Sequence, residues 1–201
     1  MFTTTRRRFP IISSLIFILL TSSQSGFAAW TLNQDDSALY YITSKAAAVS
    51  ELNSFTELSG SINDAGNGSL AISLSSVDTA VDIRNERMRD IVFQVASYPI
   101  ASISVQADGA MLAGMSVGET IQATFDAVIE LHGIQQNMPV ELTVNKQESG
   151  GLLVVLAKPL IINATSFGLA ESVEQLREIA GLPSINNNVV VDFTLQFDAA
   201  D

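Results

Sequence analysis

The chain has 201 residues and a formal net charge of −11, with 47% hydrophobic residues, one histidine and no cysteine. This composition is sufficient for one domain with a substantial core, and it excludes a disulfide framework, a thiolate metal site and a cysteine nucleophile. The acidic balance excludes a groove that neutralises nucleic-acid phosphates, so nucleic acid is not an expected partner.

The first 28 residues have the pattern of a cleaved secretory signal peptide. Three arginines at 6–8 precede an apolar stretch at 11–20, and the small residues Gly26 and Ala28 fit the cleavage positions. Ten helical residues rise about 15 Å, half of the roughly 30 Å hydrocarbon layer. We expect cleavage after Ala28 and a single domain, 29–201, in the bacterial periplasm. Export by the Sec route is expected; the alternatives are twin-arginine export and an uncleaved anchor.

Alternation of apolar and polar residues dominates the rest of the chain and predicts antiparallel strands. The longest example is 119–131, where Ile121, Ala123, Phe125, Ala127, Ile129 and Leu131 point to one side. The same pattern occurs at 70–74, 103–107, 140–144 and 189–197, and a more continuous apolar run at 152–162 is interrupted by Lys158-Pro159. Turn signals at 64–68, 132–133, 149–151 and 186–188 separate these segments. Long strands joined locally predict a mainly β fold, an antiparallel barrel of about eight strands.

Two segments have helical spacing instead. Residues 82–96 have apolar positions at helical spacing, with Asp82 as the expected N-cap and Tyr98-Pro99 beyond the end; these positions are Met88, Ile91, Val92 and Val95. Residues 171–180 have apolar positions at helical spacing and stop before Gly181. We expect one moderate and one short helix inserted between the strands.

The sequence offers few residues that could catalyse a reaction or bind a metal ion. A Ser-His-Asp triad would have to use His132, the only histidine, but it lies in a strand-to-turn step and no Gly-x-Ser-x-Gly motif is present. A structural histidine that bonds the local backbone is the alternative. One histidine with scattered carboxylates offers no zinc or iron site. We therefore expect no enzyme, no metal and no cofactor.

A basic cluster occurs at 84–90, although the chain is strongly acidic. Arg84, Arg87 and Arg89 lie beside an expected helix start, which suits a phosphate or similar headgroup. The alternative is local pairing with Asp82, Glu86 and Asp90 on a solvated helix face. Phenylalanines are also spread along the chain. In a small barrel these rings either fill the interior or line a pocket for an apolar ligand.

The order of motifs along the chain has a counterpart in a known family. The motifs are Trp30-Thr31-Leu32, Phe55-Thr56-Glu57-Leu58-Ser59-Gly60, Ser76-Val77-Asp78-Thr79, the segment 84–90 with Phe93 and Tyr98-Pro99, Leu131-His132-Gly133 with Pro139-Val140, and Ser166-Phe167-Gly168-Leu169. In this order they resemble the YceI-like family, bacterial periplasmic proteins with a lipocalin-like barrel that bind polyisoprenoid lipids. The segment from Phe55 to Gly60 resembles the family's early aromatic-then-glycine turn. Ala164 and Asn137 stand where basic residues are common in the family.

The resemblance implies a carrier whose barrel houses an isoprenoid tail, as in a quinone or a polyprenyl compound. The residues expected to line the pocket are Phe55, Met88, Phe93, Phe125, Ala127, Ile129, Leu131, Phe193 and Leu195, with Arg84, Arg87 and Arg89 as headgroup candidates. Transient contact with inner-membrane components is a further expectation. Two alternatives stay open at this point: a solidly filled barrel that binds a protein partner, and an enzyme that uses His132.

Overall fold

The computed structural model describes Met1 and residues 28–200, so that the predicted signal peptide, 1–28, falls outside this range except at its two ends. The strands are β1 (Ala28–Lys45), β2 (Val49–Phe55), β3 (Leu58–Asn63), β4 (Asn67–Ser73), β5 (Val77–Asp78), β6 (Ile100–Gln106), β7 (Thr120–Leu131), β8 (Ile134–Lys146), β9 (Leu152–Leu156), β10 (Leu160–Asn163) and β11 (Asn188–Ala199). The helices are α1 (Asp82–Arg87), α2 (Gly109–Gly114) and α3 (Ala170–Ile179), with short η1 (Leu74–Ser76), η2 (Met88–Val92) and η3 (Ala164–Phe167).

Eight antiparallel strands close into a barrel. Their order is β1-β11-β9-β8-β7-β6-β4-β3, and β3 pairs with β1 again. The short strands β2, β5 and β10 extend the wall at one end, where β2 pairs with the second half of β1 and β10 with the first half of β11. The predicted mainly β barrel of about eight strands is confirmed.

Strand β1 bends at a bulge so that its two halves have different partners. The register against β11 shifts between Asn33 and Ala38. Side chains replace the missing ladder bonds: the Ser37 hydroxyl donates to the Asn33 carbonyl oxygen at 2.6 Å, and the backbone N–H of Gln196 donates to the Ser37 hydroxyl at 3.0 Å. The bulge therefore changes the direction of the strand while its polar groups keep partners.

The alternating segments form strands with the predicted faces. In β7, Ala127 and Ile129 are buried and Thr124 and Asp126 are exposed. In β11 the buried residues are Phe193, Leu195 and Phe197. The apolar run at 152–162 becomes two strands, β9 and β10, separated at Lys158-Pro159, because proline cannot donate a ladder hydrogen bond.

The helices differ in part from the prediction. The helix predicted at 82–96 is α1 followed by a single π-helical turn, η2, which ends at Val92 because Gln94 takes a left-handed conformation (φ 49°). The N-cap is Val81, and Asp82 is already the first helical residue, so the predicted cap is wrong. The helix predicted at 171–180 is confirmed as α3. The sequence analysis missed α2, although the Asp108 side chain caps it by accepting from two backbone N–H groups.

Two glycine motifs have different structural roles. His132 and Gly133 both have positive φ and form the two-residue turn between β7 and β8, as predicted. Gly60, expected in a turn, lies inside β3 instead. A Cβ at this position would stand 2.5 Å from the carbonyl oxygen of Ser69 on β4, so the close approach of the two strands requires glycine.

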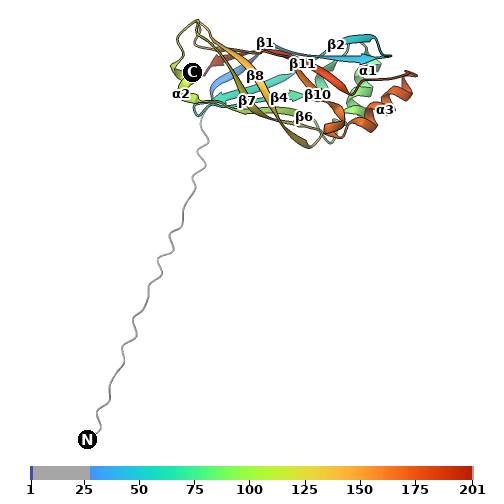
Figure 1. Cartoon of the computed structure of the whole chain (residues 1–201), viewed down its shortest axis with the longest axis horizontal. Coiled ribbons are helices and arrows are strands. Elements are labelled where there is room, and N and C mark those ends of the chain that lie inside the picture. The colour runs from blue at the N-terminus through green and yellow to red at the C-terminus, as the bar shows by residue number, and fades with distance from the viewer. Residues whose placement is uncertain (2–27, 201) are drawn as a thin grey trace.

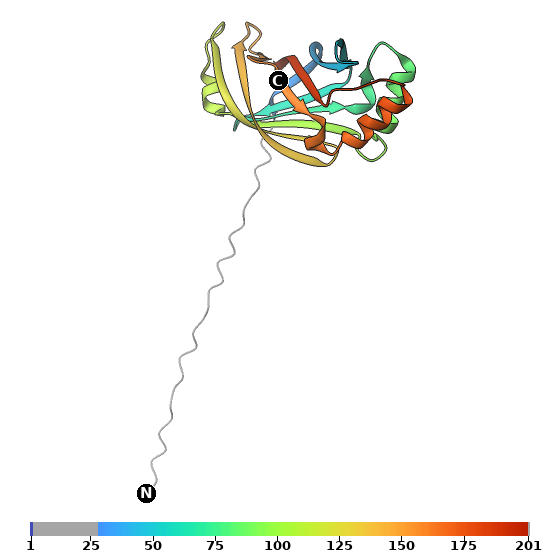
Figure 2. The same cartoon turned by 45° about the vertical axis from the view of Figure 1, so that its right-hand side comes forward.

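The two ends of the barrel are covered by different elements. Helices α1 and α3 lie at one end, together with the β1–β2 hairpin, and α2 lies at the other (Figure 1). The view in Figure 2 shows the same separation. Within residues 28–200, no helix has the length and apolar character needed to cross a membrane.

We predict that Trp30 is a main source of stability at the α2 end. Its indole is buried, the Nε1–H donates to the Gly150 carbonyl oxygen at 3.0 Å, and the Lys146 ammonium lies 4.9 Å from the ring centroid. Trp30→Ala should lower the free energy of unfolding by about 3–5 kcal/mol, and Trp30→Phe by less, because the ring volume is largely kept. Urea unfolding followed by far-UV circular dichroism measures both, and equal losses would contradict this role.

Candidate ligand-binding site

The barrel is hollow at the end covered by α1 and α3. A cavity of about 260 Å³ lies there, lined by inward-facing residues of the strands and by residues of α1, η2 and α3. A smaller cavity of about 70 Å³ lies toward α2, among the aromatic rings of Phe125, Phe193 and Phe197. A barrel filled solidly along its whole length, one of the alternatives left open by the sequence, does not match this interior.

The predicted pocket residues divide between the two cavities. Those that line the larger cavity are Phe55, Met88, Phe93, Ile129 and Leu131. Those that line the smaller cavity are Phe125, Phe193 and Leu195. Ala127 has 0% of its surface exposed and lines neither cavity. Along the inward face of β7, Phe125 therefore lines the smaller cavity and Ile129 lines the larger one. Ala127 lies between them, where the barrel interior is closely packed.

Three aromatic rings form one wall of the larger cavity. Tyr41 stacks on Phe55 with 5.3 Å between ring centroids, and Phe55 packs against Phe93 at 5.7 Å. These rings come from β1, β2 and the segment after η2, so the wall joins the barrel to the helix that covers it. Such aromatic pairs add to the stability gained from burial alone.

A polar cluster interrupts this apolar lining. The Arg84 Nη1 lies 2.6 Å from the Glu51 Oε2, and the Lys45 Nζ lies 2.8 Å from the Glu51 Oε1. Arg84 also donates through Nη2 to the Thr79 carbonyl oxygen. Next to it, the buried Asn53 amide donates to the Thr43 hydroxyl at 3.1 Å. All of these residues line the larger cavity.

The electrostatics of the cluster follow from this geometry. The hydrogen bond from Arg84 holds the pKa of Glu51 below its usual value, and Lys45 acts in the same direction. Burial raises the pKa of the Tyr41 phenol, which therefore stays protonated at neutral pH. Two donors in the described part of the chain have no partner here: the Tyr41 hydroxyl and the Arg84 Nε–H. Unpartnered buried donors are costly, so an acceptor oxygen on a ligand would stabilise this site.

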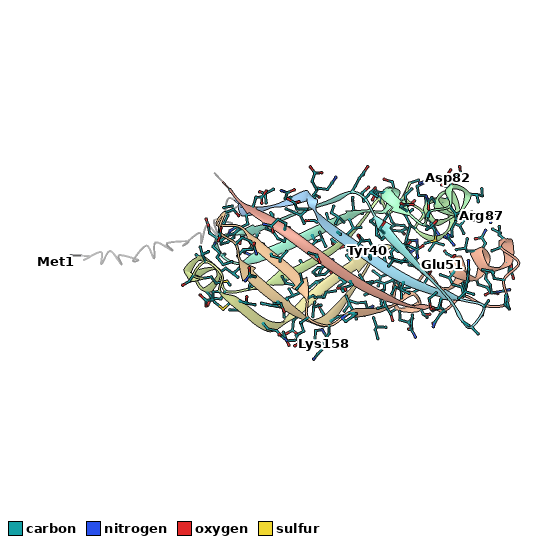
Figure 3. All side chains as sticks on the ribbon, turned by 90° about the horizontal axis from the view of Figure 1, so that it is seen from above. Met1, Tyr40, Glu51, Asp82, Arg87 and Lys158 are labelled. Atoms are coloured by element: carbon teal, nitrogen blue, oxygen red, sulfur yellow. The ribbon has the colours of Figure 1, made fainter. Side chains whose placement is uncertain are left out.

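The three headgroup candidates have different positions. Arg84 and Arg87 line the larger cavity, and Arg89 does not. Figure 3 shows Arg87 and Glu51 at the same end of the barrel. Within residues 28–200, none of the three arginines forms an ion pair with Asp82, Glu86 or Asp90. Local pairing, the alternative reading of this cluster, is therefore absent from the described residues.

Sequence reasoning missed the partners of Arg84. Its ion-pair partner, Glu51, lies 33 positions before it and on β2. A signal was nevertheless present at the start of β2, because Glu51 and Asn53 share the alternation phase of Phe55, which places two polar side chains on an inward face. Inward polar residues of this kind mark a site rather than a core.

His132 lies away from this site. Its ring packs against Tyr98 with 4.1 Å between centroids, in the turn between β7 and β8, and it lines neither cavity. Burial lowers its pKa, and its Nε2 has no hydrogen-bond partner. Among the described residues, no three His, Asp or Glu side chains gather as metal ligands.

Comparison with known proteins agrees with this architecture. A polyisoprenoid-binding domain from Saccharophagus degradans, implicated in plant cell wall breakdown, is 37% identical, with 87% of this chain and 100% of that domain covered and a TM-score of 0.84. Burkholderia cenocepacia BcnA (16% identity, 82% and 98% coverage, TM-score 0.64) and a Campylobacter jejuni YceI protein (14%, 74% and 85%, 0.54) share the fold. No curated protein matches the sequence significantly.

The sequence pattern of one family extends over almost all of the described chain. Residues 30–197 match that of the YceI-like domain. The match begins at Trp30 in β1 and ends at Phe197 in β11, so it includes every strand of the barrel and both cavities. The resemblance seen in the motifs is confirmed, and the chain belongs to the YceI-like domain family.

Proposed function

We propose that this protein binds a long isoprenoid lipid, a prenyl quinone or a polyprenyl compound, with its tail in the larger cavity. The observation that carries the proposal is an apolar cavity of about 260 Å³ at the end of the barrel, in a chain 37% identical to a polyisoprenoid-binding domain. Burial of each methylene contributes about 0.8 kcal/mol. A tail of several isoprene units would therefore bind tightly through apolar contacts alone.

The polar cluster is the proposed headgroup site. The Tyr41 hydroxyl and the Arg84 Nε–H are unpartnered donors beside the cavity, so they suit an oxygen acceptor on the ligand. Glu51 pairs with both Arg84 and Lys45, so the cluster keeps one positive charge and its donors suit a quinone oxygen or a phosphate oxygen. Arg87 is the side chain available to a charged headgroup, because it lines the cavity and has no ion pair among the described residues.

The direct test is native mass spectrometry of the protein purified from its own cells, followed by lipid extraction. A bound mass that resolves to a prenyl quinone or polyprenyl compound would support the proposal and identify the cargo. A ligand-free mass that persists after incubation with ubiquinone and with polyprenyl phosphate would contradict it. That second result would favour a protein-binding barrel.

We further propose that the protein acts in the periplasm, because residues 1–28 have the pattern of a signal peptide. The expected N-terminus of the cellular protein is Ala29. Intact mass measurement after cell fractionation tests this, with periplasmic and membrane fractions analysed in parallel. A protein that retains Met1 and remains in the membrane fraction would contradict cleavage.

A second prediction concerns the larger cavity. Leu131→Trp places a bulky ring in this cavity, where Leu131 is only partly buried, and should reduce prenyl loading at least about tenfold, because the ring occupies the space of the tail. The matched control is Val128→Trp on the same strand, whose side chain lies on the outer face of the barrel. Quantitative lipid extraction from both folded variants measures the difference. Equal loading would place the tail elsewhere.

A third prediction concerns pH. The pKa of Glu51 is lowered in the folded protein, so its stabilising effect is complete above the usual value of 4.5 and is lost as the pH falls through the lowered value. Glu51→Gln should lower the free energy of unfolding at pH 7 by about 2 kcal/mol and should flatten the loss of stability on acidification below pH 4.5. Urea unfolding across the pH range measures both effects. The control is Glu57→Gln, an exposed carboxylate, which should change neither.

A further inference from the structure

Large apolar side chains are exposed mainly at the end of the barrel that contains the larger cavity. Twelve such residues occur within 28–200, and only Met111 and Val117 lie at the α2 end. Eight of the others lie on β1, β2, α1, β6, β10 and α3 or directly beside residues of these elements that line the larger cavity. Exposed apolar residues that gather on one region, rather than scattering singly, mark an interaction surface.

Three elements frame the opening of this cavity, and each carries an exposed aliphatic residue beside a lining residue. On the β1–β2 hairpin, Val49 (46% exposed) pairs with Lys45; on α1, Ile83 (52%) precedes Arg84; and on α3, Ile179 (46%) precedes Ala180. Lys45, Arg84 and Ala180 line the cavity, and the three aliphatic residues do not. The opening is therefore surrounded by aliphatic side chains directed to solvent, which we call the apolar rim.

The elements of the apolar rim are held at one end of the molecule. The Arg84–Glu51 ion pair joins α1 to β2, and a bridge between Lys45 and Ile185 joins the hairpin to the segment after α3. Figures 1 and 3 show α1, β2 and the labelled Glu51 and Arg87 at this same end. The three exposed residues can therefore meet one surface together.

Charged side chains are also distributed unevenly between the elements of the apolar rim and the rest of the molecule. Five of the seven basic side chains of residues 28–200 lie on the three elements of the apolar rim or on η2, which follows α1: Lys45, Arg84, Arg87, Arg89 and Arg177. The same elements carry nine of the twenty acidic side chains, and the other eleven lie elsewhere with only two basic side chains, Lys146 and Lys158. The elements of the apolar rim are therefore less negative than the rest of the molecule, so an anionic surface repels them less than it repels the α2 end, and the lipid headgroups of a bacterial membrane present such a surface.

We propose that the apolar rim docks on the surface of a lipid bilayer, so that an isoprenoid tail moves between the bilayer and the cavity without crossing water. This inference rests on the proposed function for its cargo. A bilayer suits the apolar rim because its aliphatic residues stand on three separate elements, and fluid acyl chains accommodate separate protrusions that a rigid protein partner would have to match in shape. The opening of the cavity then faces the membrane that holds the ligand.

The test compares two variants with the unaltered protein. The first combines Val49→Glu, Ile83→Glu and Ile179→Glu in the apolar rim. The second, a matched control, combines Met111→Glu and Val117→Glu at the α2 end, where these side chains are 40% and 60% exposed. Thermal unfolding verifies that both variants are folded, and none of the five residues lines the larger cavity.

Docking is measured by flotation with phosphatidylethanolamine vesicles that contain about a quarter phosphatidylglycerol. Exchange is measured as the rate at which ubiquinone moves from such vesicles to the protein. The rim variant should lose both flotation and exchange rate by at least about tenfold, because charged residues do not enter the interface. The control variant should match the unaltered protein.

A separate measurement isolates the cargo. Ubiquinone delivered from detergent micelles should load the rim variant and the unaltered protein equally. Absence of flotation by the unaltered protein, or equal flotation and exchange by the rim variant, would overturn the docking proposal. If the unaltered protein floats through its apolar rim but takes up no ubiquinone from micelles or vesicles, docking is supported and the proposed cargo is wrong.

Discussion

The pairing of β1 with β11 is the interaction on which the rest of the structure depends. It joins the first and last strands of the described chain, from Trp30 against Ala199 to Ile42 against Val190, and so converts an open sheet into a closed barrel of eight strands. The bulge after Asn33 is part of this closure. It turns β1 so that its first half pairs with β3 and its second half with β2, which widens one end of the wall.

The widened end explains where the cavity lies. At the α2 end, Phe125, Phe193 and Phe197 point inward and α2 adds Leu112, so little space remains. At the other end the wall is extended by β2 and β10, and the covering helices contribute smaller or flexible side chains such as Met88 and Val173. Close packing is the default in protein interiors, so a cavity of this size persists only because the wall and helices hold it open.

Parts of the fold were predictable because they are encoded locally. Strands β7 and β11 have an alternation whose phase also selects the buried face, and α3 has helical spacing and a glycine after its end. The segment after Asp82 was harder, because its apolar spacing continues beyond Val92 although the backbone does not. The end of that helix coincides with the left-handed conformation of Gln94, an exposed residue of a type that rarely adopts it, so the residue type gives no signal for the end.

The sequence by itself determined the fold class, the family and the set of inward-facing residues, because strand alternation and motif order are local properties of the chain. Only the tertiary structure decided which inward residues border a cavity. On one strand, β7, it placed Ile129 at the larger cavity and Phe125 at the smaller one. It also decided that Arg84 pairs with Glu51 rather than with the acids beside it on α1. The physical reason is that a cavity and a long-range ion pair are made by strands and helices that are distant in sequence, and their relative position follows from barrel closure.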